Sequence, residues 1–229
     1  MAPEPRRFHG RRLARPLTQR RKELIERLLP RLRIALPEAG TLDPRALFVP
    51  PRRQVWLEIG FGGGEHLAWQ AERHPEVGFV GCEPFLNGLA SLLTMIDGRQ
   101  LANVRLHPDD ARLLMARLAP QSIDRCFILF PDPWPKARHK KRRIVSTETL
   151  DWLGQAMADN AELRLASDDA DYVEHMLEVT TAHPAFRPKR IGEESAARPE
   201  DWPPTRYEEK ARAKGASCRF LIFERLPRN

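Results

Sequence analysis

The amino-acid sequence predicts an α/β fold in which a mostly parallel sheet is covered by helices on both faces. Apolar runs of strand length alternate with helical segments from about residue 54 to residue 182, and chains that alternate in this way form parallel sheets. A cluster of glycines, Gly60 to Gly64, comes directly after the first run, where a strand would turn into a helix. With 229 residues, 41% of them hydrophobic, the chain is long enough for one domain with a sizeable core.

The predicted elements follow one another in a regular order. A helical pattern over residues 21–36 is broken by Pro37 and Gly40. Strands are expected at 54–60, 77–83, 103–107, 123–130 and 161–167, and helices at about 65–73, after residue 83, and at 111–118, 147–159 and 170–182. Residues 186–191 and 217–225 predict two more strands joined by a long polar link, which indicates an antiparallel hairpin at one edge.

The positive charge is concentrated in two segments. The chain has a formal charge of +7, but residues 1–33 carry +8 and residues 136–143 carry six Lys/Arg and no acid, so the remainder is acidic. Such a distribution favours binding to a polyanion, although a solvated tail and a solvated loop would give the same pattern. We expect residues 1–33 to form a basic, partly disordered arm with a short helix, and residues 34–229 to form a single domain.

Cysteine usage and the lack of a long apolar stretch indicate a cytoplasmic protein. Cys82, Cys126 and Cys218 are odd in number and form no C-x-x-C pair, so neither a disulfide framework nor a metal site is expected. No run approaches the roughly 18 apolar residues that a membrane span needs. The Arg-rich start of the chain contains prolines and no apolar core, which disfavours a signal or transit peptide.

The glycine cluster belongs to the segment Glu58-Ile-Gly60-Phe-Gly62-Gly63-Gly64. A dinucleotide fingerprint fails because its third glycine would fall on Glu65, and a phosphate-binding P-loop fails because no Lys follows. The segment fits E-x-G-x-G-x-G, a pattern typical of class I methyltransferases. Their cofactor, S-adenosylmethionine, is cationic, so an acidic residue beside the glycines suits it better than it suits a phosphate.

Two more acidic residues end the next two predicted strands. Glu83 follows the second strand and Asp110 the third, and parallel strands bind ligands at the edge where their carboxyl ends meet. A carboxylate at Glu83 accepts hydrogen bonds from ribose hydroxyls, and Asp110 lies where this fold places the adenine. Each acid alone is more often a helix cap or a solvated charge. Together with the glycines they predict a cofactor site of Glu58, Gly60, Gly62, Glu83 and Asp110.

The fourth strand leads into a proline-rich loop and then into a dense cationic run. Prolines on both sides of Asp132 stiffen the loop, and Trp134 and the basic residues follow it. An acid, an aromatic ring and cations in one segment suit recognition of a base and of its phosphates. An ordinary turn followed by a solvated basic loop is the simpler alternative.

At this point the sequence resembles bacterial tRNA (guanine-N7-)-methyltransferases. The resemblance rests on LEIGFGGGEHL, GCEPF, NVRLHPDDA, FPDPWPKARHKKRRIV, ASDDADYVEHM and TRYEEKARAKG in that order, over about residues 54–225. It implies a monomeric, Rossmann-like class I methyltransferase fold with a mostly parallel seven-stranded sheet. It also implies S-adenosylmethionine as cofactor and methylation of a guanosine in the tRNA variable loop, usually at position 46. Cofactor contacts are then implied at Glu58, Glu83, Asp110 and Asp132, and substrate contacts at Lys136, Arg138, Lys140, Lys141, Arg142, Arg143, Asp168, Thr205 and Glu208.

Asp132 is the residue that we predict to take part in the chemistry. Guanine N7 has a lone pair and no proton, so its methylation needs positioning and electrostatic stabilisation but no general base. Asp132, together with Asp168, is expected to accept hydrogen bonds from the guanine N1–H and amino group. Two alternatives remain: a methyltransferase acting on an exocyclic amine of a base, whose N/D-P-P-aromatic loop resembles Pro131–Trp134, and a non-catalytic RNA-binding module.

Overall fold

The structure is a computed structural model that describes residues 16–213 and 215–228. Within these residues seven strands form one sheet in the order β3-β2-β1-β4-β5-β7-β6. The strands are β1 (Val55–Ile59), β2 (Gly78–Cys82), β3 (Val104–His107), β4 (Ile123–Leu129), β5 (Met157–Ser167), β6 (Phe186–Arg190) and β7 (Arg219–Arg225). Strands β1 to β5 pair in parallel and β7 pairs antiparallel with both β5 and β6. The predicted mostly parallel sheet with an antiparallel edge pair is confirmed.

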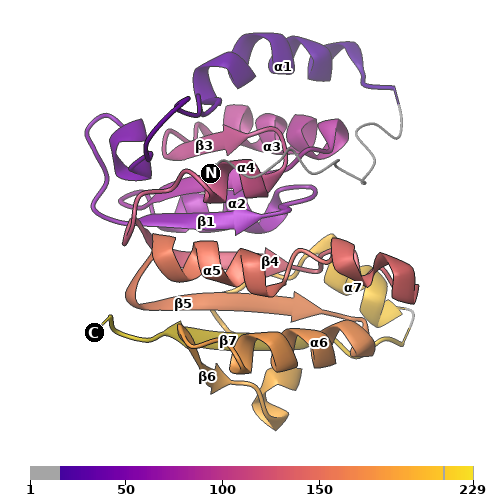
Figure 1. Cartoon of the computed structure of the whole chain (residues 1–229). Coiled ribbons are helices and arrows are strands. Elements are labelled where there is room, and N and C mark those ends of the chain that lie inside the picture. Colours follow the sequence, from indigo (N-terminus) through magenta and orange to yellow (C-terminus); the bar gives the residue numbers. More distant parts are fainter. Residues whose placement is uncertain (1–15, 214, 229) are drawn as a thin grey trace.

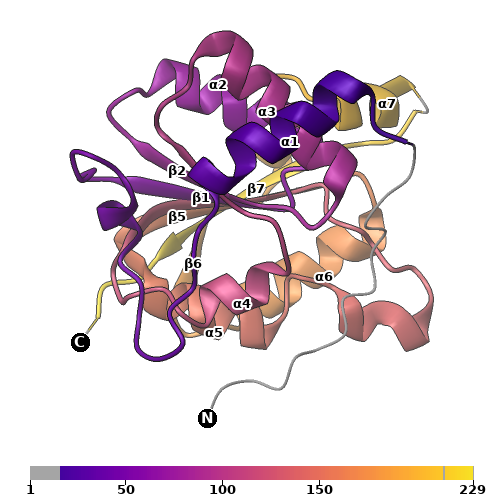
Figure 2. The ribbon, with the colours of Figure 1, turned by 90° about the horizontal axis from the view of Figure 1, so that it is seen from above.

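Helices lie on both faces of the sheet (Figures 1 and 2). They are α1 (Gln19–Leu32), α2 (Glu65–Arg73), α3 (Leu86–Arg99), α4 (Ala111–Met115), α5 (Thr147–Ala156), α6 (Ala170–Thr181) and α7 (Arg206–Ala213), with short 3₁₀ turns at Pro44–Leu47, Ala137–Arg142 and Glu193–Ala196. Figure 2 shows α4, α5 and α6 on one face and α1, α2, α3 and α7 on the other. Each layer buries its own hydrophobic cluster against the sheet.

Strand β1 shows how the sequence assigns side chains to the two layers. Its alternate residues Val55, Leu57 and Ile59 join the cluster beneath α4, α5 and α6, whereas Trp56 joins the cluster beneath α1, α2 and α3. Successive strand residues point to opposite faces, so a strand covered on both sides is apolar throughout. Glu58 breaks this rule, because it is an acid in the middle of the sheet with only 5% of its surface exposed.

Helix α1 packs on α3 through Leu24, Leu28 and Leu32, which are spaced by one helical turn and belong to the second cluster. The chain then reaches the edge strand β3, where the Ile34 amide donates a hydrogen bond to the Leu106 carbonyl. The basic helix predicted after the N-terminal arm is therefore packed on the body of the protein. Most of the predicted arm, residues 1–15, lies outside the described residues.

The first difference from the sequence prediction is that helices α1, α4 and α5 end earlier than expected, and the end of α5 shows a physical cause. The helix ends at Ala156 and β5 starts at Met157, although the sequence pattern extends the helix to residue 159. Arg225 and Arg228 donate to the Gly154 carbonyl, so cations from the end of the chain satisfy the carbonyl groups at the end of α5.

The second difference is helix α7, which lies in the segment that was predicted to be a polar link. Its signal was present as Thr205-Arg-Tyr-Glu208, a capping-box pattern, and the Thr205 hydroxyl accepts a hydrogen bond from the Glu208 amide at 3.2 Å. The ion pair between Glu208 and Arg212, one turn later, supports the same helix. The prediction relied on apolar periodicity alone, and this segment has little of it.

Gly88 of α3 lies directly against the turn that follows β1, which leads to a stability prediction. A Cβ at Gly88 would lie 2.1 Å from the Gly62 carbonyl oxygen, whereas a Cβ at Gly98 of the same helix meets nothing within 4 Å. We expect Gly88→Ala to lower the free energy of unfolding by about 1–3 kcal/mol through overpacking. Gly98→Ala, the matched control, raises it by up to about 1 kcal/mol because alanine favours helices. Urea denaturation measures both changes, and equal shifts would contradict the close approach at Gly88.

Candidate cofactor and substrate site

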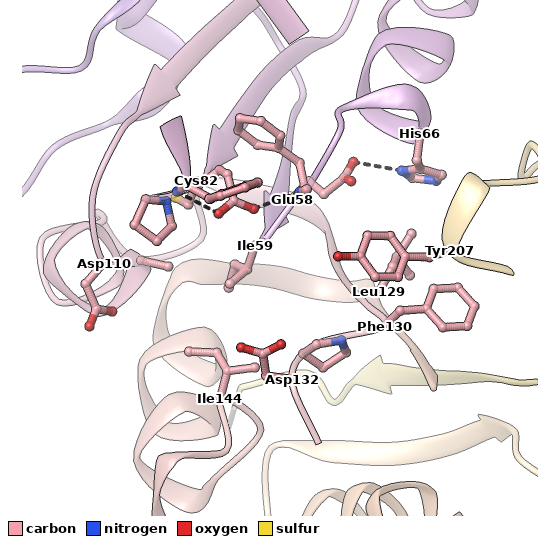
Figure 3. Close-up of a pocket in the computed structure, with 18 of the residues that line it drawn as sticks. Glu58, Ile59, His66, Cys82, Asp110, Leu129, Phe130, Asp132, Ile144 and Tyr207 are labelled. Carbon is pink, nitrogen blue, oxygen red and sulfur yellow. Dashed lines mark hydrogen bonds and ion pairs between the residues drawn. The ribbon is translucent and has the colours of Figure 1, made fainter. Parts of the chain in front are cut away.

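A cavity of about 1020 Å³ opens at the carboxyl ends of the parallel strands (Figure 3). Four of the predicted acids, Glu58, Glu83, Asp110 and Asp132, line it together. They arrive from four different strand ends, and parallel strands deliver such side chains to one edge of the sheet. The cavity is also lined by Gly60, Gly62, Lys141, Arg142 and Thr205, which were predicted, and by His66, Arg112, Trp134 and Tyr207 among others.

The glycine turn between β1 and α2 forms one wall of the cavity. Gly60, Gly62 and Gly64 all have positive φ, at 72°, 54° and 81°. A side chain at Gly64 would also clash, because its Cβ would lie 2.7 Å from the Cβ of Leu92. Only glycine accommodates both constraints there, so the turn keeps the backbone of residues 60–62 open to a ligand.

Glu83 ties this turn to the start of α3. Its two carboxylate oxygens accept hydrogen bonds from the Gly62 amide at 2.8 Å and from the Phe85 amide at 2.9 Å. Burial, together with the smaller effect of the Asp132 and Glu58 charges, nevertheless raises the pKa of Glu83 to about 7 and outweighs the two amide hydrogen bonds, which lower it. Negative charge is therefore crowded in the cavity, and a bound cation would relieve it.

Glu58 approaches the cavity from the middle of β1 and is paired with a histidine. Its Oε2 lies 2.7 Å from Nδ1 of His66, and both side chains are buried. Gln70, one turn further along α2, continues the contact on the other side of the imidazole ring. The sequence prediction named Glu58 and missed His66. The signal was available, because His66 is the second residue of the helix predicted directly after the glycine turn, close to the end of the strand that carries Glu58.

Asp110 combines the roles of a helix cap and a cavity acid. Its Oδ1 accepts the Arg112 amide at 3.0 Å at the start of α4, and its Oδ2 pairs with the Arg112 guanidinium at 3.0 Å. Arg112 also lines the cavity and was not predicted. One carboxylate therefore both begins the helix and fixes a cation on the cavity wall.

Asp132 lies in a loop whose backbone is held in an unusual conformation. Phe130 and Trp134, two residues before and after Asp132, have positive φ of 49° and 46°, which costs about 1–3 kcal/mol each for a residue with a side chain. Arg142 lies over the Trp134 ring at 5.0 Å, and Arg143 donates to the Pro133 carbonyl at 2.9 Å. The loop is thus fixed from the basic segment, and Asp132 faces the cavity (Figure 3).

The predicted basic residues separate into two groups. Lys141 and Arg142 line the cavity, while the exposed Lys136 and Arg138 lie outside it. Lys140 bonds to Asp171 of α6 at 2.6 Å. The 3₁₀ turn Ala137–Arg142 sets these directions, and its exposed cations face solvent, where a polyanion can reach them.

Arg143 differs from the prediction of a substrate contact. Only 2% of it is exposed, its guanidinium bonds to Asp171 and to the Pro133 carbonyl, and it packs on the Tyr172 ring. Hydrogen bonds from Lys140 and Arg143 lower the pKa of Asp171 to about 2, so this anchor is ionised at neutral pH. Arg143 therefore holds the Asp132 loop in place from behind.

The three late predicted residues also separate. Thr205 lines the cavity, whereas the exposed Asp168 at the end of β5 does not. Glu208 was expected to contact the substrate, but it is 2% exposed and its Oε1 binds Arg198 at 2.8 Å and Arg212 at 2.9 Å. Glu208 is therefore a buried ionic anchor of α7. The neighbouring Tyr207, which the prediction missed, is 62% exposed and reaches into the cavity (Figure 3).

Comparison with known proteins shows which family combines this fold and this cavity. A family model described as "Putative methyltransferase" matches residues 52–221. A tRNA (guanine-N(7)-)-methyltransferase of Paramagnetospirillum magneticum is 48% identical over 99% of this chain and 96% of its own length. A protein of the same name from Rhodospirillum rubrum is 48% identical over 98% and 90%. The chain belongs to the tRNA (guanine-N(7)-)-methyltransferase family. It is accordingly a methyltransferase that uses S-adenosylmethionine.

Solved structures agree with the fold at much lower identity. The antibiotic-resistance methyltransferase Kmr is 17% identical with a TM-score of 0.54, covering 85% of this chain and 98% of that one. The 16S rRNA (adenine(1408)-N(1))-methyltransferase from Catenulisporales acidiphilia is 16% identical with a TM-score of 0.52, covering 86% and 99%. These likenesses establish the class I methyltransferase fold alone.

Membrane-spanning helices and metal-binding clusters are both absent from the described residues. None of the described helices combines the length and the apolar character that crossing a lipid bilayer requires. The same part of the chain contains no group of three or more His, Cys, Asp or Glu side chains arranged to hold a metal ion.

The raised pKa of Glu83 leads to a prediction about pH. Its pKa is 4.5 when unperturbed and about 7 in the fold, so across that interval the folded state keeps a proton that the unfolded state releases. Stability should therefore fall as the pH rises between these values. A cationic ligand favours the ionised carboxylate, so the affinity for S-adenosylmethionine should rise through about pH 7, and binding should expel a proton.

Calorimetry at about pH 6 and about pH 8, in two buffers of different ionisation enthalpy, measures the affinity for S-adenosylmethionine and the proton released on binding. Glu83→Gln serves as the control, because it removes the titrating group and should give weaker binding with less pH dependence. Proton uptake on binding would contradict this assignment.

Proposed function

We propose that this protein transfers a methyl group from S-adenosylmethionine to N7 of a guanosine in tRNA, at position 46 of the variable loop. The observation that carries the proposal is a single cavity in which cofactor-type carboxylates meet a cationic segment. Glu58, Glu83, Asp110 and Asp132 line it together with Lys141 and Arg142 of the basic turn. The curated relatives, 43–48% identical, carry the same activity in their names.

The carboxylates suit the cofactor by number, position and charge. When bound, S-adenosylmethionine supplies a methyl group on a cationic sulfur atom that a nucleophile can take. Glu58 faces the glycine turn and would bind the ammonium end, while Glu83 would accept the ribose hydroxyl groups. Asp110 would lie toward the adenine. Burial, and to a smaller extent the charges of Asp132 and Glu58, raise the pKa of Glu83, and a cationic ligand would offset both effects.

The other side of the cavity suits a nucleotide. Asp132 carries acceptor oxygens toward the cavity and would bind the guanine N1–H and amino group, which adenine lacks as donors at those positions. Trp134 and Tyr207 offer aromatic faces at the same cavity. Lys141 and Arg142 would bind the phosphates of the target nucleotide, and Lys136, Arg138 and Lys140 those of its neighbours.

The chemistry follows from guanine itself. N7 has a lone pair and no proton, so the residues do not need to remove one, and positioning is the main requirement. The guanine ring gains positive charge during the transfer, and the Asp132 carboxylate stabilises it. The anchoring of its loop by Arg143 and by the stacked Arg142 keeps Asp132 in place before the substrate arrives.

Methylation of an exocyclic amine is the second candidate, because Pro131-Asp132-Pro133-Trp134 resembles the acidic, proline-containing loop of such enzymes. Only one proline separates the acid from the aromatic residue here, so the match is incomplete. Incubation of unmodified tRNA with labelled S-adenosylmethionine, followed by mass spectrometry of the nucleosides, tests the proposal. N7-methylguanosine supports it, an N-methylated exocyclic amine replaces it, and binding of tRNA without methylation indicates a non-catalytic module.

We also propose that the protein acts as a monomer in the cytoplasm. Cys82, Cys126 and Cys218 are buried and unpaired, which suits a reducing compartment. The domain division into a basic N-terminal segment, residues 1–33, and a catalytic body, residues 34–229, belongs to the same proposal. The N-terminal segment would add cations that attract the tRNA body.

Removal of the Asp132 carboxylate should abolish most of the activity without unfolding the protein. Asp132 is exposed to the cavity and its carboxylate makes no hydrogen bond within the described part of the chain, so Asp132→Ala should change stability by less than about 0.5 kcal/mol. Turnover should fall by about a hundredfold or more, the scale for one electrostatic group in an active site. Glu178→Ala, at an exposed acid on α6, is the control. Near-normal turnover in Asp132→Ala would exclude this residue from the site.

The exposed cations of the basic turn should contribute to tRNA binding by contacting its phosphates. Arg138, outside the cavity, and Lys141, at its wall, are exposed and are not structural anchors as Arg143 is, so Arg138→Ala and Lys141→Ala remove cations without removing an anchor. Removing one cation that contacts a phosphate should reduce the slope of log affinity against log salt concentration by about 0.7–0.9. Arg187→Ala on β6, whose side chain pairs with Glu224 at 2.7 Å, is the control and should leave the slope unchanged. Equal slopes for all three variants would contradict RNA binding by this turn.

A further inference from the structure

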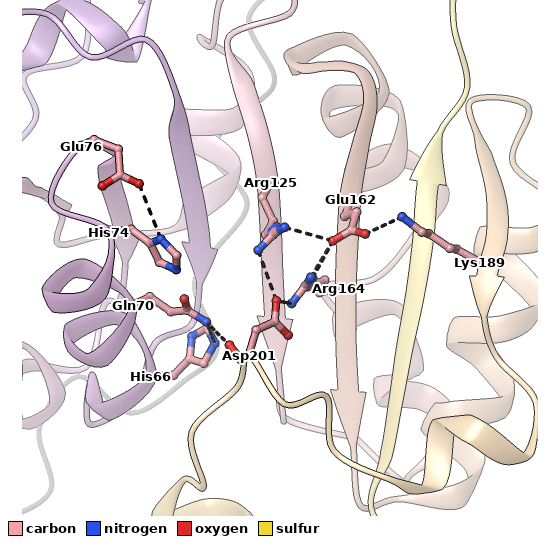
Figure 4. A network of polar contacts seen from close by, with 9 residues as sticks. All are labelled: His66, Gln70, His74, Glu76, Arg125, Glu162, Arg164, Lys189 and Asp201. Carbon is pink, nitrogen blue, oxygen red and sulfur yellow. Dashed lines mark hydrogen bonds and ion pairs between the residues drawn. The ribbon is translucent and has the colours of Figure 1, made fainter.

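A buried polar chain runs from the cavity acid Glu58 to the segment that leads into α7. His66 Nδ1 contacts Glu58 Oε2 at 2.7 Å, and His66 Nε2 lies 3.3 Å from the Gln70 side-chain nitrogen. The same Gln70 nitrogen donates to the Asp201 backbone carbonyl at 2.8 Å (Figure 4). Gln70 is 1% exposed and His66 is 3% exposed, so water does not replace these partners. The proposed transfer reaction uses only Glu58 of these four residues.

The backbone carbonyl of Asp201 sets the orientation of Gln70. A carbonyl oxygen can only accept, so the atom of Gln70 that lies 2.8 Å away must be its NH₂ group. If the amide were flipped, two oxygens would face each other at that distance. The Gln70 Oε1 has no hydrogen-bond partner among the described residues, so no other contact opposes this orientation.

The orientation of Gln70 in turn sets the protonation of His66. The second hydrogen of the Gln70 NH₂ group can be donated to Nε2 of His66, 3.3 Å from the Gln70 nitrogen, and that nitrogen can accept it only with a free lone pair. The remaining ring proton must then lie on Nδ1, where it is donated to the Glu58 carboxylate. His66 is thereby a neutral imidazole in the Nδ1–H form, which is the less common form in water.

The Asp201 carbonyl is held firmly enough to fix the orientation of Gln70 and, through it, the protonation of His66. The Asp201 carboxylate pairs with Arg164 at 2.7 Å and lies 3.5 Å from Arg125, and both arginines project from central strands. The next residue, Trp202, is 4% exposed and packs its ring against His66 at 6.0 Å between centroids. The carbonyl therefore has little freedom to turn away from Gln70.

We propose that Gln70 is a positioning residue that keeps His66 neutral in its Nδ1–H form, so that Glu58 remains an uncompensated anion facing the cofactor. An imidazolium at His66 would neutralise Glu58 and weaken its attraction for a cation. Within the described part of the chain, the ion pair of His66 is with Glu58 alone, and its ring otherwise packs against Phe127 and Trp202. Arg125 and Arg164, which pair with the Asp201 carboxylate, are also paired with Glu162.

This inference rests on the proposed function only for the identity of the cation, since the hydrogen bonds among Glu58, His66, Gln70 and Asp201 exist in the free protein. Long-range ¹H–¹⁵N correlation spectra of the full chain with ¹⁵N-labelled histidine, without cofactor or tRNA, report which ring nitrogen carries the proton. The signal that disappears in His66→Gln identifies His66. We expect Nδ1 protonated and Nε2 unprotonated near neutral pH. A proton on Nε2 overturns the inference, whether or not the protein methylates tRNA.

Gln70→Glu changes the acceptor pattern with almost no change in shape. A carboxylate cannot donate to Nε2 and accepts a proton from it, so we expect an imidazolium at His66 in the spectra. The affinity for S-adenosylmethionine by calorimetry should fall about tenfold, which corresponds to about 1.4 kcal/mol. An unchanged tautomer together with unchanged affinity overturns the inference.

Two further variants protect the test against a folding failure. Gln70→Met removes the donor without adding charge, and here we expect the neutral Nδ1–H form to be mixed with the imidazolium, which carries a proton on both ring nitrogens. Gln155→Met on the exposed side of α5 is the matched control and should leave both the His66 signal and the affinity unchanged. Retention of the pure Nδ1–H form in Gln70→Met would show that Glu58 alone sets the tautomer and would overturn the role of Gln70. Absence of tRNA methylation with the expected tautomers would reject the proposed function and leave this inference standing.

Discussion

Crowding of carboxylates at one edge of the sheet is the constraint on which the rest of the site depends. Glu58, Glu83, Asp110 and Asp132 line one cavity, although like charges in a partly buried space repel one another. The fold limits the cost with nearby donors: two backbone amides for Glu83, His66 for Glu58 and Arg112 for Asp110. Burial, with a smaller contribution from the charges of Asp132 and Glu58, still raises the pKa of Glu83, and a cationic cofactor would favour its ionised form.

The basic turn serves two physical purposes that the charge count alone does not separate. Arg143 and Arg142 are directed inward, the first to the Pro133 carbonyl and the second over the Trp134 ring, and they fix the loop that carries Asp132. Lys136 and Arg138 are directed outward, and the exposed Lys141 lines the cavity. Attraction of a polyanion and the placement of the Asp132 carboxylate are thus built into neighbouring residues. A nucleotide bound to the outer cations would lie close to Asp132.

Helix α2 and the segment before α7 connect the cavity residue Glu58 with the cavity residues Thr205 and Tyr207. Trp202 packs against His66 and Phe127, while the carboxylate of Asp201 pairs with arginines of β4 and β5. Thr205 and Tyr207, which line the cavity, follow this docked segment within a few positions. The antiparallel strand β7, inserted beside β5, brings the end of the chain back to this region.

The sequence by itself determined the parallel core, the glycine turn and the acids that share its edge, because consecutive parallel strands must end on the same side. Glu58, Glu83, Asp110 and Asp132 could be placed together from their positions after strands. Tertiary structure alone decided that Arg143 and Glu208 are buried anchors, since their partners Asp171 and Arg198 come from other segments. It also decided the contact between Gln70 and Asp201, 131 residues apart. Local patterns report which face of an element is apolar, but pairing between distant polar groups depends on how the layers pack.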